Sequence, residues 1–84
     1  MTIRTLLVDD NIAILDSVER YVKSLPGVEV VGRARSGQQA IQLVVQLHPD
    51  LVLMDVTMPG MNGLEATQQI KKLPGAPRVI VLSV

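Results

Sequence analysis

The chain contains no cysteine, no tryptophan and no phenylalanine, and Tyr21 is its one aromatic residue. Without cysteine it cannot form a disulfide scaffold, a thiolate zinc site or a thiol nucleophile. A single aromatic ring leaves no platform on which nucleic acid bases could stack. Eight basic and eight acidic side chains cancel, so no long-range charge draws the chain toward nucleic acid or an anionic membrane. We therefore expect no direct nucleic acid partner.

Long apolar runs are missing as well. No stretch approaches the roughly 18 apolar residues that a transmembrane helix needs. Asp9 and Asp10 interrupt the first apolar segment too early for a signal peptide. The lack of cysteine agrees with a reducing compartment, so we expect a cytoplasmic protein with no membrane partner. The 84 residues are enough for one domain, which we assign to residues 1–84.

Aliphatic residues dominate what is present, and 48% of the chain is hydrophobic, which is too apolar for a disordered segment. Short apolar runs predict strands at 3–8, 28–32, 50–54 and 79–84. Apolar residues at helical spacing predict helices over the segments between them, 12–25, 36–47 and 62–73. Apolar strands that alternate with amphipathic helices predict an α/β fold, a doubly wound parallel sheet with helices on both faces.

Helix boundaries are indicated by capping residues. Ser36 is expected to cap the second helix with Gln39 as its capping-box partner, and Asn62 to cap the third helix with Glu65. The second helix is expected to end at His48, because the residue before a proline resists the helical conformation. The buried stripe of the third helix is predicted to consist of Leu64, Ala66, Ile70 and Leu73.

Acidic residues stand at the ends of two predicted strands. Asp9 and Asp10 follow the first strand, and Asp55 follows the third. Ligands bind outside the carboxyl ends of strands in open parallel sheets, and Ser83 is expected at the same edge. Clustered carboxylates repel one another, and a hard divalent cation such as Mg²⁺ resolves that repulsion. The alternative is that each aspartate only caps the helix that follows it.

Three segments carry a resemblance to a known family: Leu-Leu-Val-Asp-Asp at 6–10, Asp-Leu-Val-Leu-Met-Asp-Val-Thr-Met-Pro-Gly-Met-Asn-Gly-Leu-Glu-Ala at 50–66, and Val-Ile-Val-Leu-Ser at 79–83. The chain resembles the receiver domain of bacterial two-component response regulators, of the type that usually precedes a helix-turn-helix DNA-binding domain. This resemblance implies a flavodoxin-like (CheY-like) fold with the strand order 2-1-3-4.

The resemblance also implies a role for each site residue. Asp55 would be the phosphoacceptor and would take a phosphoryl group from a sensor histidine kinase. Asp9, Asp10, Asp55 and the backbone carbonyl of Thr57 would hold Mg²⁺ or Mn²⁺, with Asp10 as a direct ligand and Asp9 acting largely through water. Ser83 would be the switch hydroxyl that turns toward the phosphoryl oxygens.

A receiver of this family has five strand–helix units and about 120 residues, so the resemblance implies that the chain is truncated. The fourth helix, the fifth strand with its lysine and the fifth helix would be missing. We therefore expect slow or undetectable phosphorylation with surviving Mg²⁺ affinity. Arg35 is a weak candidate for a substitute cation, and a solvated loop residue is its simpler interpretation. The alternative function is a non-switching, structural or self-associating fragment that keeps only the acidic pocket.

The expected strand order would leave the strand at 79–84 on an open, apolar edge, which natural proteins usually protect. We therefore expect a homodimer or a larger assembly through this strand. A hydrolase with Asp55 as nucleophile is a further possibility, because Asp55-Val56-Thr57 has a suitable order of residues. Such an enzyme needs a general acid and a cap that the sequence does not supply, so we expect no enzyme.

Overall fold

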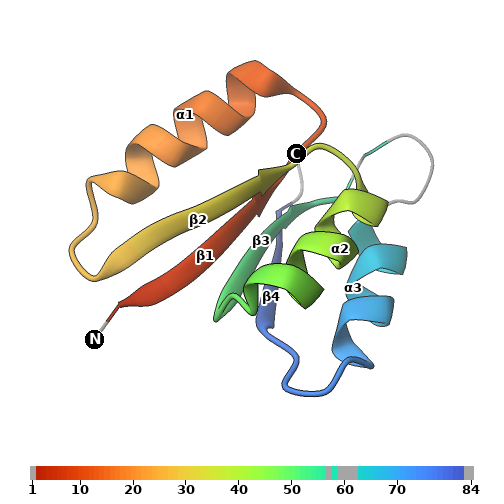
Figure 1. The fold of residues 1–84 in the computed structure, drawn as a ribbon. Coiled ribbons are helices and arrows are strands. Elements are labelled where there is room, and N and C mark those ends of the chain that lie inside the picture. Colours follow the sequence, from red (N-terminus) through yellow and green to blue (C-terminus); the bar gives the residue numbers. More distant parts are fainter. Residues whose placement is uncertain (1, 57, 59–62, 83–84) are drawn as a thin grey trace.

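The computed structural model describes residues 2–56, 58 and 63–82. Strands and helices alternate along the chain in the predicted order (Figure 1). They are β1 (Ile3–Val8), α1 (Ile12–Lys23), β2 (Val28–Ala34), α2 (Gly37–Leu47), β3 (Leu51–Asp55), α3 (Gly63–Lys71) and β4 (Arg78–Leu82). The second strand is two residues longer than predicted and ends at Ala34.

All strand pairs are parallel, and the strand order is β2-β1-β3-β4. The parallel pairing confirms the sheet predicted from the alternation of apolar strands and amphipathic helices, and the strand order confirms the one that the family resemblance implies. Helix α1 packs on β1 and β2 from one side, and α2 and α3 lie together on the other side (Figure 1). Val8 pairs with Met54 near the carboxyl ends of β1 and β3, so the residues after both strands meet at one edge of the sheet.

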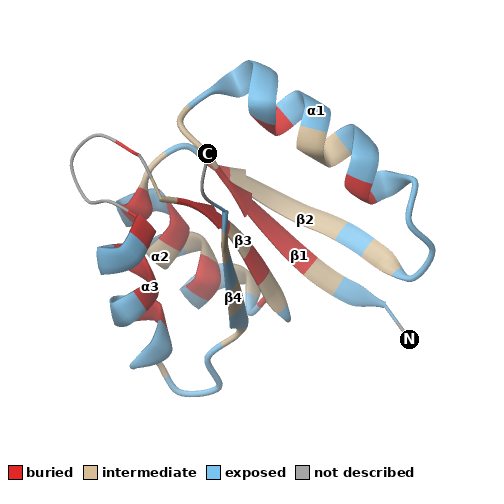
Figure 2. Ribbon diagram, turned by 180° about the vertical axis from the view of Figure 1, so that it is seen from behind, coloured by how far each residue is buried: buried red, intermediate tan, exposed pale blue. Residues whose placement is uncertain are grey.

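The main core lies between the sheet and the helices α2 and α3. Successive side chains of a strand point to opposite faces, so alternate residues of β1 and β3 enter this core, and buried positions run along both strands (Figure 2). The residues buried there are Leu6, Val8, Ala34, Ala40, Val44, Val52, Met54, Met58, Ala66 and Ile70.

The predicted stripe of α3 was wrong at one position. The side chain of Leu64 is 54% exposed, whereas Ala66, Thr67 and Ile70 are buried. Two residues correspond to a rotation of about 200° around a helix, so a helix that buries position 66 turns position 64 to solvent. Thr67 lies on the buried side and satisfies its hydroxyl within the helix, donating a hydrogen bond of 2.7 Å to the carbonyl of Gly63.

The boundaries of α2 follow the predicted signals closely. The Ser36 hydroxyl accepts a hydrogen bond of 3.1 Å from the Gln39 amide. The Gln39 side chain accepts from the amide of Arg35 at 2.8 Å, one residue before the position that a capping box would use. The helix ends at Leu47, and its C-cap His48 adopts a left-handed conformation with φ 49° before Pro49. Asn62, the predicted cap of α3, lies outside the described residues.

Among the described residues, no helix has both the length and the apolar character that crossing a membrane requires.

Candidate functional site

Three carboxylates meet at the carboxyl edge of the sheet. Asp9 and Asp10 follow β1, Asp55 ends β3, and one carboxylate oxygen from each lies within 4.8 Å of those of the other two. The parallel pairing of β1 with β3 produces this cluster, as the strand ends predicted. Asp55 is 7% exposed, and Asp9 and Asp10 are half-buried, so the cluster is partly withdrawn from solvent.

Asp9 shows the electrostatic cost of this arrangement. Burial raises the pKa of its carboxyl group, and the negative charges of Asp55 and Asp10 raise it further. One contact acts in the opposite direction, since the amide of Asn11 donates a hydrogen bond of 2.9 Å to the Asp9 carboxylate and lowers the pKa. Burial and the neighbouring carboxylates therefore both disfavour the charged form of Asp9.

Asn11 is a residue that the sequence reasoning missed. Its side chain accepts a hydrogen bond of 3.2 Å from the amide of Ile14 and caps α1. The alternative role proposed for Asp9 and Asp10, capping the helix that follows, thus belongs to Asn11. An asparagine directly before an apolar residue at helical spacing was the signal that could have identified it.

Gly63 holds the backbone of Asp55 in place by close contact. A Cβ atom at position 63 would lie 2.1 Å from the carbonyl oxygen of Asp55 and 2.9 Å from the Cα of Val56. The amide of Gly63 also donates a hydrogen bond of 3.2 Å to the carbonyl of Val56. Only glycine permits this approach without a backbone shift, so the start of α3 fixes where Asp55 stands.

The end of β4 lies against the same segment. Asp55 pairs with Leu82, and the amide of Val56 donates a hydrogen bond of 3.2 Å to the Leu82 carbonyl. Ser83 comes next in sequence, but Ser83 and Thr57 lie outside the described residues. The switch role of the Ser83 hydroxyl and the ligand role of the Thr57 carbonyl therefore stay predictions.

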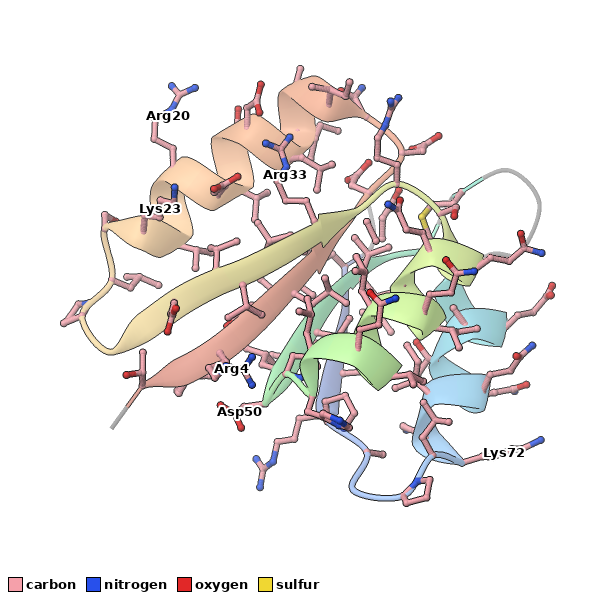
Figure 3. The ribbon with its side chains drawn as sticks, in the orientation of Figure 1. Arg4, Arg20, Lys23, Arg33, Asp50 and Lys72 are labelled. Carbon is pink, nitrogen blue, oxygen red and sulfur yellow. The ribbon has the colours of Figure 1, made fainter. Side chains whose placement is uncertain are left out.

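Another aspartate, Asp50, stands at the opposite edge of the sheet. Its carboxylate accepts a hydrogen bond of 2.9 Å from the amide of Arg4, and the Arg4 guanidinium donates to the carbonyl of His48 at 2.9 Å. Figure 3 shows Arg4 and Asp50 next to each other at the amino-terminal ends of the strands. Asp50 is thus a structural residue and serves as a control for Asp55.

The acidic cluster fits a hard divalent cation. Mg²⁺ binds through one or two carboxylates and keeps several waters, and three carboxylates at this spacing can supply such ligands. Burial raises the pKa of Asp9 first and the charges of Asp55 and Asp10 raise it further, and a cation would relieve that second contribution. Asp9, Asp10 and Asp55 are the described residues that would hold Mg²⁺ or Mn²⁺.

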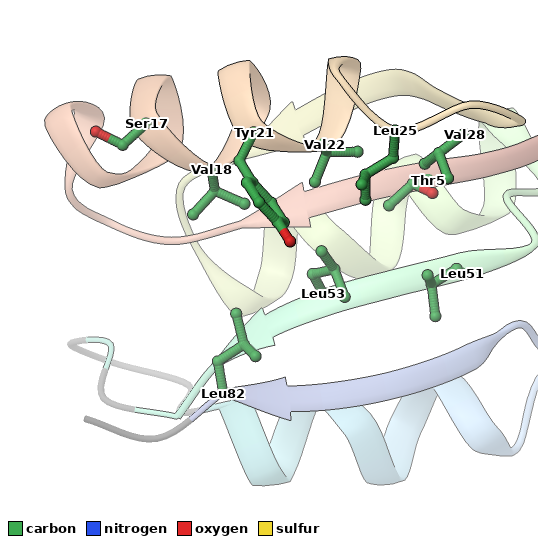
Figure 4. A pocket seen from close by; sticks show the side chains of 10 residues that line it. All are labelled: Thr5, Ser17, Val18, Tyr21, Val22, Leu25, Val28, Leu51, Leu53 and Leu82. Atoms are coloured by element: carbon green, nitrogen blue, oxygen red, sulfur yellow. The ribbon is translucent and has the colours of Figure 1, made fainter.

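A second surface feature lies between α1 and the sheet. Side chains of α1 and of β3 and β4 line a groove of about 510 Å³ whose walls are almost entirely apolar (Figure 4). Tyr21 from α1 and Leu53 and Leu82 from the sheet line it. Ile80 and Leu82 on β4 are 49% and 44% exposed, so this part of the sheet has no covering layer in the described chain.

Comparison with known proteins identifies similar sequences and folds. Residues 5–84 match the model of the response regulator receiver domain. The chain is 41% identical to the transcriptional regulatory protein LiaR of Bacillus subtilis over 96% of its own length and 38% of that protein. It is 38% identical to a protein-glutamate methylesterase/protein-glutamine glutaminase of Desulfotalea psychrophila, over 96% of the chain and 22% of that protein.

Among solved structures, a two-component response regulator of the LuxR family from Aurantimonas sp. SI85-9A1 superposes with a TM-score of 0.93. The sequence identity is 36%, and the match covers 99% of this chain and 59% of that one. The chain thus spans about two fifths of LiaR and three fifths of the superposed structure.

Proposed function

Because the chain belongs to the response regulator receiver domain family, we propose that it accepts a phosphoryl group on Asp55 from a sensor histidine kinase. The observation that carries this proposal is the convergence of three carboxylates, with Asp55 the most buried of them, at the carboxyl edge of the sheet. Clustered acids of this kind suit metal-assisted phosphoryl transfer, in which the protein mainly positions groups and stabilises charge.

The proposed step transfers a phosphoryl group from a donor phosphohistidine to Asp55. The phosphorus–nitrogen bond of the donor phosphohistidine breaks, and its electron pair stays on the imidazole nitrogen, which takes up a proton. A carboxylate oxygen of Asp55 forms the new bond to phosphorus, so Asp55 becomes an acyl phosphate. A bound Mg²⁺ supplies charge neutralisation for the phosphoryl oxygens.

The residues of this chain supply the geometry for that step. Asp9 and Asp10 hold the divalent cation beside Asp55, and Asn11 orients the Asp9 carboxylate through its amide. Gly63 fixes the Asp55 backbone by direct contact. The half-buried position of the cluster limits the access of water, which favours electrostatic stabilisation in the site. In this proposal the chain is a signalling module in the cytoplasm and not an enzyme.

We also propose that two copies of this 84-residue chain associate through β4. The support is the uncovered part of the sheet, where Ile80 and Leu82 are about half exposed beside the apolar groove. Among the described residues, β4 pairs with β3 alone, so its other edge offers free backbone hydrogen-bonding groups. Burial of apolar side chains and added strand pairing both favour association at such an edge.

The phosphoacceptor role is tested by comparing Asp55→Asn with Asp50→Asn. We measure binding of trifluoroberyllate, an analogue of the phosphoryl group, in the presence of Mg²⁺ by fluorine NMR. We also measure uptake of phosphate from acetyl phosphate by intact mass. Wild type and Asp50→Asn should bind the analogue, and Asp55→Asn should not, because the acceptor carboxylate is gone.

Phosphate uptake by the chain is expected to be slow, since we identify no lysine beside the acidic cluster in the described residues. An Asp55→Asn variant that still binds trifluoroberyllate would contradict the proposal. Wild type that binds Mg²⁺ but neither the analogue nor phosphate would favour the alternative of a fragment that keeps only the metal pocket.

A further inference from the structure

The carboxyl end of β2 brings a positive charge to the acidic site. Ala34 pairs with Val8, and the Ala34 carbonyl accepts a hydrogen bond of 3.0 Å from the amide of Asp9. Arg35 is the next residue. Its guanidinium lies 3.4 Å from the backbone carbonyl oxygen of Asp10, a residue whose carboxylate belongs to the cluster. Arg35 thus reaches the loop that carries two of the three acids.

The backbone of Arg35 is held by the start of α2. Its amide donates to the side chain of Gln39 at 2.8 Å, and the Gln39 amide donates in turn to the Ser36 hydroxyl at 3.1 Å. The side chain is exposed, and its contact with the Asp10 carbonyl is long for a hydrogen bond. A fixed backbone with a loosely held guanidinium allows that group to move from Asp10 to a nearby anion at low cost.

Arg35 differs from the neighbouring Arg33 in its partners. The Arg33 guanidinium forms ion pairs with Asp16 at 2.9 Å and Glu19 at 3.2 Å on α1, and Figure 3 shows it directed toward that helix. Within residues 2–56, 58 and 63–82, no carboxylate lies at ion-pair distance from Arg35. Its charge is therefore available to a ligand, whereas that of Arg33 is already compensated.

We propose that Arg35 is a phosphoryl-binding residue that pairs with the oxygens of the group transferred to Asp55. This inference rests on the proposed function of Asp55. The three carboxylates and a phosphoryl group together exceed the charge of one divalent cation, and a guanidinium reduces that excess. Its N–H donors match phosphate oxygens in a bidentate arrangement. The simpler sequence interpretation, a solvated loop residue, does not explain why the guanidinium contacts the Asp10 loop.

This role has a signature that a structural role lacks. The charge that attracts phosphoryl oxygens also repels Mg²⁺ before any phosphoryl group arrives. Removing it should weaken binding of the phosphoryl analogue and strengthen binding of Mg²⁺ alone. A residue that only supported the local fold would weaken both ligands together when it is replaced.

The test uses Arg35→Gln, which removes the charge but keeps a side-chain donor for the Asp10 carbonyl. In saturating Mg²⁺, the affinity for trifluoroberyllate should fall about threefold to tenfold by fluorine NMR. Without trifluoroberyllate, the affinity for Mg²⁺ measured by titration calorimetry should rise by up to about twofold. The effect is small because salt screens the charge of an exposed guanidinium. Arg35→Lys keeps the charge but loses the planar fork, so its analogue affinity should be intermediate.

Arg33→Gln is the matched control, since it removes the same charge two residues earlier, on β2, and neither affinity should change. Unchanged analogue affinity in Arg35→Gln, with normal binding by wild type, would refute the role of Arg35 alone. A parallel loss of affinity for trifluoroberyllate and for Mg²⁺ would also refute this role of Arg35 and would indicate a structural role. Wild type that binds no trifluoroberyllate would refute phosphoryl acceptance at Asp55 itself.

Discussion

Helices α2 and α3 cover one face of the sheet together, whereas α1 lies against only β1 and β2 on the other. On the first face, Val52, Met54 and Ile70 are fully buried in a continuous core. On the second face, an apolar groove of about 510 Å³ extends over β3 and β4. The acidic site lies at the carboxyl edge of the sheet, where both faces end. The face toward α2 and α3 is closely packed next to the site, whereas the other face is open over β3 and β4.

The difference matters because a buried side chain on the packed face contributes more to the free energy of folding than a half-exposed one on the open part of the other face. Fully burying an aliphatic side chain contributes about 1.5–3 kcal/mol, and the half-exposed residues of β4 realise only part of that. The backbone of Asp55 is nevertheless fixed from the packed side, through the contact of Gly63 at the start of α3. The site can thus be ordered while the groove beside it remains available for association.

The largest expected effect compares the two faces directly. Ile70→Ala creates a cavity in the packed core and should lower the free energy of unfolding by about 3 kcal/mol. Ile80→Ala removes the same atoms from a side chain that is 49% exposed and should cost less than about 1 kcal/mol. Urea unfolding at low protein concentration, followed by circular dichroism, measures both. Equal losses of unfolding free energy in the two variants would mean that the two faces contribute equally to stability.

Where Ile70→Ala does not fold, Ile70→Val provides the milder change, with an expected loss of about 1 kcal/mol. The loss of unfolding free energy should still be larger for Ile70→Val than for Ile80→Ala. A smaller loss for Ile70→Val than for Ile80→Ala would count against the comparison.

The second prediction concerns the open face. Ile80→Lys places a charge at the proposed contact and should raise the dissociation constant of the dimer by about tenfold or more, because an unpaired charge would have to be buried. Light scattering across a concentration series, up to about 50 micromolar, measures the association. Leu64→Lys is the matched control, since Leu64 is similarly exposed, at 54%, on α3.

A wild-type chain that stays monomeric over this range would contradict association through β4. Equal dissociation by Ile80→Lys and Leu64→Lys would place the contact elsewhere on the surface.

How much of the structure the sequence predicted depends on whether a feature is set by the local sequence or by contacts between distant segments. The parallel sheet and the meeting of Asp9, Asp10 and Asp55 were predictable, because they depend on periodicity and on which residue follows a strand, whereas the strand order was implied by the family resemblance. The exposure of Leu64 was not, because the orientation of α3 depends on how it packs against α2 and β3. Leu64 fits the apolar stripe of α3 in the sequence, and only the tertiary contacts of the helix decide that it faces solvent.

The site shows the same limit. Gly63 belonged to the motif that carried the family resemblance, but its steric reason is a contact with the Asp55 backbone, which lies eight positions earlier in the chain. The position of Arg35 beside the Asp10 carbonyl depends on how the ends of β1 and β2 pair. The strand ends predict which residues gather at this edge of the sheet, but which of them are in contact depends on the three-dimensional register of the strands.

The smallest expected effect concerns the electrostatic cost of the acidic edge. Asp9→Asn removes one negative charge from a cluster in which burial and the charges of Asp55 and Asp10 raise the pKa of Asp9. The new side chain can still accept the hydrogen bond of the Asn11 amide. Without divalent cation, the variant should gain about 0.5 kcal/mol of unfolding free energy, a value reduced by solvent screening.

With Mg²⁺ the order should reverse, because a bound ligand stabilises the folded wild type and Asp9→Asn has lost one metal-holding group. Thermal unfolding of both chains with EDTA and with saturating Mg²⁺ measures this crossing, and Asp50→Asn at the opposite edge serves as the control. A loss of stability in Asp9→Asn without metal would mean that the Asp9 charge supports the fold. In that case the negative charge at this edge would be compensated within the protein, and a divalent cation would not be needed there to relieve it.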